Sequence, residues 1–308
     1  MSICAYLREI GRGRHHAKNL DPTQAQDLMG QILDGTVSDL ELGAFCVAMR
    51  VKGESQDELT GFMQAAHARM TPFSSTAPCV VIPSYNGARR LPLLTPLLAG
   101  LLAKQGVAVL IHGMSTEPQR VACQSVIEAL RWPVLHAARP LHAGEVVFVP
   151  TAVLNVGLQR LLDVRRSIGL RNSGHSLVKL LCPVRTPSLL ITSYTHPEYA
   201  TTMSQALAHA GVNALLLRGT EGEAVADPRR LPLIEAVLQQ QKVTLASAQT
   251  GPLEHMPSLP EQIDAHSTAR FIEAVLAGHA AVPAPIQTQV QCALDALAQL
   301  AGLRVSSH

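Results

Sequence analysis

The chain has 308 residues and 47% of them are hydrophobic, so it can bury a substantial core and is neither disordered nor fibrous. The formal net charge is only +2, which over the whole chain argues against a dedicated nucleic-acid binder. Aromatic residues make up 3%, so the core must be aliphatic, as is common in parallel sheets covered by helices.

A small helical domain is predicted at the start of the chain, over residues 1–75. Asp21 and Pro22 are typical of an N-cap followed by the first residue of a helix. Two more helix starts show the capping-box pattern of a serine followed three residues later by a glutamate, at Ser38 with Glu41 and at Ser55 with Glu58. Residues 71–78 are rich in Ser, Thr and Pro and are predicted to form a linker.

After this linker, short apolar strands alternate with helices, which implies crossover connections and a mostly parallel sheet. The predicted strands are residues 79–82, 107–111, 146–149, 189–191, 214–217 and 243–246. We therefore expect an α/β fold, in which a small N-terminal helical domain precedes a larger α/β domain with a mostly parallel central sheet covered by helices. The larger domain is expected to span 78–150 and 184–308, and helices within about 153–182 are expected to complete the helical domain.

The cysteines and the apolar segments indicate in which cellular compartment the protein is expected. The N-terminus lacks the apolar core of a secretory signal, and the longest apolar stretch, residues 91–103, is interrupted by Pro92 and Pro96 and is too short to span a bilayer. We expect a cytoplasmic protein with no membrane contact. The cysteines form no CxxC pair and have no histidine at metal-ligand spacing, and are expected to be free thiols: Cys4, Cys46, Cys79, Cys123, Cys182 and Cys292.

Several motifs resemble one family of enzymes. Residues 33–62 (LDGTVSDLELGAFCVAMRVKGESQDELTGF) resemble the helical domain of the anthranilate phosphoribosyltransferases, and strand-loop motifs follow in that family's order over essentially the whole chain. The resemblance is strongest to the YbiB-type branch, and it implies nucleic-acid-binding paralogues that lack the tryptophan-pathway activity. The motifs that carry it are PSYNGARR (83–90), GLRNSGHSLVKL (169–180), SYTHPEY (193–199) and RGTEGE (218–223).

The loop after the first strand departs from the enzymes. The resemblance implies a Gly-Thr-Gly-Gly-Asp loop there, whose glycine amides approach the pyrophosphate of phosphoribosyl pyrophosphate closely. The matching residues contain a single glycine and are Ser84, Tyr85, Asn86, Gly87 and Ala88. Arg89 and Arg90 follow and would hold a phosphate by side-chain charge, whereas the alternative is a surface turn with solvated arginines.

The loop after the second strand also differs. The family carries Lys-His-Gly-Asn there, and this chain retains His112 and Gly113 between the apolar residues Ile111 and Met114. A single histidine at a strand end is more often a hydrogen-bonded structural residue than a catalyst.

The third loop follows the predicted strand at 214–217. The resemblance implies that the enzymes bind magnesium here through an acidic pair, and this chain lacks that pair. Aligning on the glycines of residues 218–223 places Ala224 and Val225 at the two acidic positions, and neither side chain can ligate a cation. Glu221 and Glu223 would replace them only with a shift in register. We expect no metal and no cofactor, and magnesium only if the protein is an enzyme.

Basic residues gather in residues 157–185, which we call the basic segment. It holds six basic residues against Asp163 alone, a local net charge of 6 − 1 = +5; the six are Arg160, Arg165, Arg166, Arg171, Lys179 and Arg185. Residues 165–169 also resemble the family's helix that offers an arginine to anthranilate. The ordinary interpretation is that Arg160 and Arg166 pair with Asp163 within one helix.

These departures favour a non-catalytic protein that binds nucleic acid, DNA in the first instance, without reading its sequence. No catalytic residue is assigned. Two alternatives remain open, namely an active glycosyltransferase or phosphoribosyltransferase of altered substrate, and a binder of a phosphorylated metabolite. The resemblance also implies a homodimer formed through the N-terminal helices, where Leu40, Leu42, Phe45, Val47 and Met49 give more apolar surface than one helical face needs.

Overall fold

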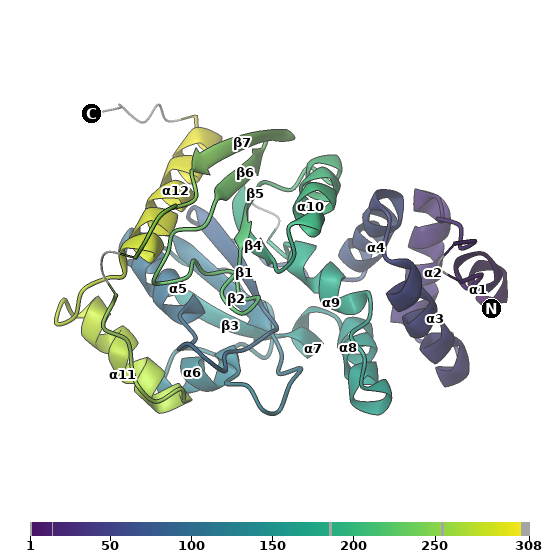
Figure 1. Ribbon diagram of the computed structural model, residues 1–308, viewed down its shortest axis with the longest axis horizontal. Coiled ribbons are helices and arrows are strands. Elements are labelled where there is room, and N and C mark those ends of the chain that lie inside the picture. Colours follow the sequence, from purple (N-terminus) through teal and green to yellow (C-terminus); the bar gives the residue numbers. More distant parts are fainter. Residues whose placement is uncertain (1, 14, 185–186, 254–255, 303–308) are drawn as a thin grey trace. The chain divides into compact units, whose positions relative to one another are not determined.

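The computed structural model describes residues 2–13, 15–184, 187–253 and 256–302 (Figure 1). The chain divides into two compact units. The first consists of Met1–Thr71 and Thr151–Pro183, and the second of Pro72–Pro150 and Val184–His308.

The first unit is entirely helical in its described part. Its elements are α1 (Cys4–Ile10), α2 (Pro22–Asp34), α3 (Asp39–Lys52), α4 (Gln56–Ala68), α7 (Thr151–Leu154), α8 (Val156–Ile168), α9 (Gly174–Leu177) and the 3-10 turn η1 (Val178–Leu180). The predicted helix starts are confirmed, because Ser38 and Ser55 both close capping boxes with the glutamates three residues later. Asp21 closes a further box with Gln24.

The bundle of the first unit is held by apolar packing and by one buried ion pair. α2 packs against α4 and α8, and the rings of Phe45 and Phe62 meet edge to face with centroids 6.1 Å apart. The Glu58 carboxylate is fully buried, and it accepts from Lys52 Nζ at 2.6 Å and from the backbone of Leu20 at 3.0 Å. These partners compensate the desolvation of the buried charge.

The second unit contains a seven-stranded sheet in the order β3-β2-β1-β4-β5-β6-β7. Its strands are β1 (Cys79–Ser84), β2 (Ala108–Gly113), β3 (Val146–Pro150), β4 (Ser188–Tyr194), β5 (Ala214–Arg218), β6 (Ile234–Leu238) and β7 (Gln241–Ala246). The first five pair in parallel, whereas β6 and β7 add an antiparallel hairpin. The predicted fold class, an α/β protein with a mostly parallel sheet, is confirmed.

Helices cover both faces of this sheet (Figure 1). The aliphatic core lies between one face and the helices α5 (Thr95–Lys104), α6 (Cys123–Ala129), α11 (Ala265–Leu276) and α12 (Ala284–Leu300). α10 (Glu198–His209) packs against β5 and β6 on the opposite face. None of the described helices is long and apolar enough to cross a membrane.

The hairpin is where the sequence prediction was incomplete. β6 was not predicted, and β7 begins at Gln241, two residues before the predicted strand. The two turn residues, Gln239 and Gln240, have positive φ angles of 49° and 68°. Such turns usually contain Asn-Gly or Asp-Gly, so the sequence lacks the usual signal for this hairpin.

Candidate functional site

The five parallel strands end at one edge of the sheet, and the loops that follow them meet there, as in other open α/β sheets. β1 ends at Ser84 and β2 at Gly113, which pair in register. β4 ends at Tyr194, beside Arg218 at the end of β5. The loops predicted to be the degenerate substrate loops therefore come together at this edge.

The loop after β1 is filled by an acidic side chain of the chain itself. Glu223 Oε1 accepts from the backbone nitrogens of Asn86 and Gly87, both at 2.8 Å. Its second carboxylate oxygen accepts from the hydroxyls of Ser84 and Thr95, the latter at 3.2 Å. Glu223 is 2% exposed, so four donors surround a buried carboxylate.

Residues 89–91, which follow in the loop after β1, bind a second carboxylate, that of Glu221. Glu221 Oε1 accepts from the backbone nitrogens of Arg90 at 2.7 Å and Leu91 at 3.0 Å, and Glu221 Oε2 accepts from that of Arg89 at 3.2 Å. Arg120 Nη1 lies 3.6 Å from the same carboxylate. Five backbone N–H groups of the type that bind anions thus already have an anionic partner within the chain.

Gly222 allows the loop after β5 to approach the loop after β1 this closely. Gly222 has a φ of 90°, and a Cβ atom there would lie 1.7 Å from the side-chain nitrogen of Asn86. Asn86 Nδ2 donates to the carbonyl of Glu221 at 3.1 Å, and Ser193 Oγ donates to that of Gly222 at 2.9 Å. Glu221 itself has a φ of 52°, which costs about 1–2 kcal/mol for a residue with a side chain and is offset by these contacts.

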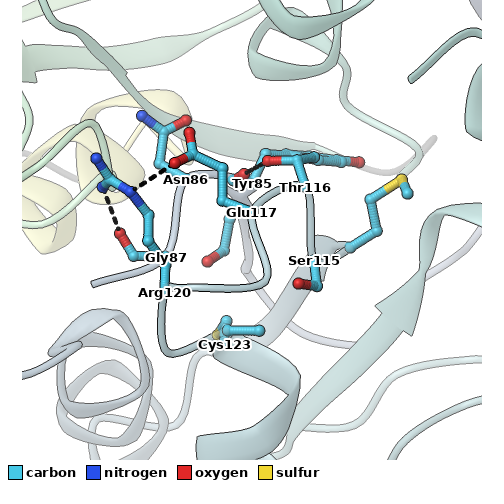
Figure 2. Close-up of a pocket in the computed structure, with 11 residues that line it drawn as sticks. Tyr85, Asn86, Gly87, Ser115, Thr116, Glu117, Arg120 and Cys123 are labelled. Carbon is cyan, nitrogen blue, oxygen red and sulfur yellow. Dashed lines mark hydrogen bonds and ion pairs between the residues drawn. The ribbon is translucent and has the colours of Figure 1, made fainter. Parts of the chain in front are cut away.

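Arg120 lies in the loop after β2 and links it to the loop after β1 (Figure 2). Arg120 Nη1 donates to the carbonyl of Gly87 at 3.2 Å, and Nε donates to Glu117 at 3.1 Å. A cavity of about 10 Å³ remains among these side chains, which is room for about one water molecule. The side chains of these loops therefore fill most of this pocket.

His112 is a buried, hydrogen-bonded residue. Its Nδ1 lies 2.8 Å from the hydroxyl of Tyr85, and the two side chains are 0% and 4% exposed. Thr116 Oγ1 donates to the Tyr85 carbonyl at 2.7 Å and fixes the loop that carries the tyrosine (Figure 2). This geometry supports the structural interpretation of His112 over a catalytic one.

The two positions at which the resemblance implies an acidic pair lie in the apolar core. Ala224 and Val225 are each 1% exposed and belong to the cluster under α12. Gln289 of α12 fixes this segment by donating to the Ala224 carbonyl at 3.0 Å and accepting from the Ala226 backbone nitrogen at 2.8 Å. Two apolar side chains cannot bind magnesium, and no group of three or more His, Cys, Asp or Glu residues within the described segments is arranged for a metal.

Cys123 also lines this region, yet it is not suited to act as a nucleophile. Burial raises the pKa of its thiol, the nearby Glu223 carboxylate raises it further, and a hydrogen bond with Ser84 lowers it in part. The reactive thiolate is therefore scarce at neutral pH.

The described basic residues of the basic segment lie in the first unit, on α8 and in the residues that follow it up to Lys179. Arg166 forms the predicted ion pair with Asp163 at 3.2 Å, but its side chain remains 71% exposed. Arg160 instead donates to the carbonyl of Ile32, at the end of α2, at 2.8 Å. The ion pair with Asp163 within one helix is thus present for Arg166, whereas Arg160 joins α8 to α2.

The remaining basic residues are divided between the two units. Arg165, Arg171 and Lys179 are half-buried in the first unit, and Arg185 lies outside the described residues. Arg89 and Arg90 are exposed in the second unit.

Sequence reasoning missed three residues of the site, namely Thr95, Arg120 and Gln289. Each acts through a contact with a residue far away in the chain; Gln289, for example, contacts residues 63 and 65 positions away. No local pattern marks such residues.

Comparisons with known proteins agree with this architecture. The glycosyl transferase family, helical bundle domain, matches residues 5–70. The chain is 38% identical to the uncharacterized protein YbiB of Escherichia coli K12, over 96% of this chain and 94% of that protein. It is 28% identical to the anthranilate phosphoribosyltransferase of Moorella thermoacetica, over 71% of this chain and 65% of that enzyme.

Solved structures give the same result for the fold. The anthranilate phosphoribosyltransferase of Thermus thermophilus superposes with a TM-score of 0.71 at 21% identity, covering 96% of this chain and 89% of that one. The enzyme of Saccharomyces cerevisiae in complex with PRPP and Mg superposes with a TM-score of 0.60 at 13% identity, covering 96% and 94%.

Proposed function

Because the chain belongs to the anthranilate phosphoribosyltransferase family, we propose that it is a member without phosphoribosyl transfer that binds nucleic acid, DNA in the first instance, through phosphate contacts. The observation that carries the proposal is the filled loop after β1. The amides of Asn86 and Gly87 are bonded to the carboxylate of Glu223, so a pyrophosphate group would meet a buried negative charge in place of open N–H donors.

The lack of a magnesium ligand pair supports the same conclusion. A pyrophosphate leaving group carries several negative charges that a divalent cation neutralises in enzymes of this chemistry. Ala224 and Val225 are buried in the core and offer no oxygen ligand. The described residues 86–87 and 224–225 thus offer neither open N–H donors nor oxygen ligands for the transfer reaction.

The basic segment supports nucleic-acid binding. The exposed guanidinium of Arg166 and the half-buried side chain of Arg165 lie on α8, and the half-buried Lys179 lies on η1 of the same unit. Clusters of this kind bind phosphates without reading bases, because affinity comes from the release of condensed counterions.

A homodimer would extend this surface. On α3, Leu40, Val47 and Val51 are 85%, 46% and 53% exposed, and their spacings of seven and four residues place them on one face of the helix. The neighbouring Phe45 and Met49 are buried within the bundle. A second copy that covers this apolar face would bring two basic segments into one particle.

The test is the salt dependence of binding to a DNA duplex and to an RNA of equal length. If about six to ten phosphates are neutralised, affinity should fall by about 10³–10⁵ between 50 and 200 mM salt. The variant Arg165→Ala/Arg166→Ala/Lys179→Ala should flatten this slope and weaken all sequences equally. Arg8→Ala, which removes an exposed charge of α1, should change neither. Binding that is insensitive to salt, or that is unchanged in the triple variant, would refute the proposal.

A further inference from the structure

The turn at residues 89–91 is built as an anion site, and its present occupant is the side chain of Glu221. We propose that this carboxylate is a displaceable plug, and that a phosphate group binds at residues 89–91 when Glu221 swings out. This site is distinct from the amides of Asn86 and Gly87, which Glu223 fills from within the core.

The donors at this turn suit a phosphate. Three consecutive backbone nitrogens, those of Arg89, Arg90 and Leu91, lie 2.7–3.2 Å from the oxygens of one carboxylate. Consecutive N–H groups that converge on one point form the kind of nest that binds phosphate oxygens in proteins. The guanidinium of Arg120, 3.6 Å from the carboxylate of Glu221, adds a charged donor.

The charges around the turn also favour an incoming anion. Arg89, Arg90 and Arg120 carry positive charge, and Glu117, Glu221 and Glu223 carry negative charge, which gives 3 − 3 = 0 with the plug in place. When the carboxylate of Glu221 leaves and Glu223 stays, the sum becomes 3 − 2 = +1. A phosphate therefore enters a site whose positive charge is uncovered by the same movement.

The plug can leave without unfolding the turn that carries it. The backbone of residues 219–223 is anchored by contacts that do not involve the Glu221 side chain, namely Asn86 Nδ2 to the Glu221 carbonyl, Ser193 Oγ to the Gly222 carbonyl, and Thr220 N to the Val225 carbonyl. The Glu221 side chain is 16% exposed, and Arg89 and Arg90 lie at the surface. Glu223, by contrast, is only 2% exposed, so its carboxylate stays in place.

The experiment measures rescue of a plugless variant by inorganic phosphate. The unfolding midpoint of full-length Glu221→Ala is followed against phosphate concentration, with sodium chloride at equal ionic strength as the reference. We expect a midpoint that is lower than that of the wild type in chloride and that rises with phosphate to saturation. Half-saturation of the wild type should need a phosphate concentration at least about tenfold higher than that of Glu221→Ala, because its own carboxylate competes for the site.

Matched variants separate a specific site from general charge effects. Glu261→Ala removes an exposed acid of the same unit and should show no more response to phosphate than the wild type. Adding Arg120→Ala to Glu221→Ala should raise the half-saturating phosphate concentration by about tenfold, since a charged donor is lost. If Glu221→Ala does not fold, the near-isosteric Glu221→Gln carries the same test, with half-saturation expected between those of wild type and Ala.

Two further arms identify the source of the phosphate. A short DNA duplex that binds Glu221→Ala more tightly than wild type, and competes with inorganic phosphate, assigns the site to a nucleic-acid backbone. A response to inorganic phosphate or pyrophosphate without any change in duplex affinity assigns it to a small phosphorylated molecule. If neither Glu221 variant responds to phosphate more than Glu261→Ala does, the inference is wrong, whether or not the chain binds DNA.

Discussion

Glu223 Oε1 lies 2.8 Å from the backbone nitrogen of Gly87, although 136 positions separate the two residues in the chain. The loop after β5 thereby supplies the anion for the loop after β1. This contact fills the loop after β1 with a side chain of the protein itself, and it ties two strand ends of the sheet together.

The first prediction concerns the stability that this contact provides. Glu223→Ala would leave two backbone N–H groups and the hydroxyls of Ser84 and Thr95 without their shared acceptor in a buried position. We expect a loss of about 3–5 kcal/mol in the free energy of unfolding, measured by urea denaturation. Glu261→Ala, at an exposed position, should stay within about 0.5 kcal/mol of the wild type. Equal stabilities for the two variants would show that the buried carboxylate contributes little.

The second prediction concerns activity. The purified protein with phosphoribosyl pyrophosphate, magnesium and anthranilate should form no phosphoribosyl anthranilate, because the loop is filled and the acidic pair is absent. Turnover at about one per second, ordinary for an enzyme, would refute the non-catalytic proposal.

The third prediction is that restoring the acidic pair does not restore a metal site. Ala224→Asp with Val225→Glu places two carboxylates in an aliphatic core, at positions that are each 1% exposed. We expect the double variant to lose at least about 3 kcal/mol of unfolding free energy. Calorimetric titration with magnesium chloride should show no binding, and saturable binding by a folded double variant would contradict the expectation.

The fourth prediction concerns association through α3. Leu40→Glu with Val47→Glu places charges on the exposed apolar face and should give a monomer by light scattering at micromolar concentration, where the wild type is expected to be a dimer. Leu253→Glu, at a position that is 39% exposed in the other unit, is the control and should leave the dimer intact. A wild type that is already monomeric would exclude the dimer.

The fifth prediction concerns acid. The backbone N–H of Ser38, with the hydroxyls of Ser2 and Ser38 and the N–H of Ile3, lowers the pKa of Glu41 to about 2 from 4.5. Because the folded-state pKa is depressed, the stabilisation is present above pH 4.5 and is lost as the pH falls toward 2. Hydrogen-exchange protection of α1 should therefore decrease in that window. Glu41→Gln keeps the capping box but not the charge, and its α1 should show no such pH dependence.

Local patterns in the sequence were sufficient to predict much of the fold. The capping boxes at Ser38 and Ser55 fix the starts of α3 and α4, because a cap is formed by residues three positions apart. Apolar runs separated by helices gave β1–β5 and their parallel arrangement, since only a crossover connection joins parallel neighbours. The hairpin of β6 and β7 was less predictable, because its turn uses Gln239 and Gln240 in place of the usual glycine.

The sequence by itself also determined what the site lacks, since one glycine in residues 84–88 and apolar residues at 224 and 225 can be read directly. Only the tertiary structure decided what the remaining acids do. From the sequence, Glu221 and Glu223 would replace the acidic pair only with a shift in register, and in the structure their carboxylates are bonded to backbone amides of residues 86–91. A carboxylate can bind either a cation or an N–H group, and its partner depends on which groups the sheet brings within about 3 Å of it. These groups lie more than a hundred residues away in the chain, so no local pattern predicts them.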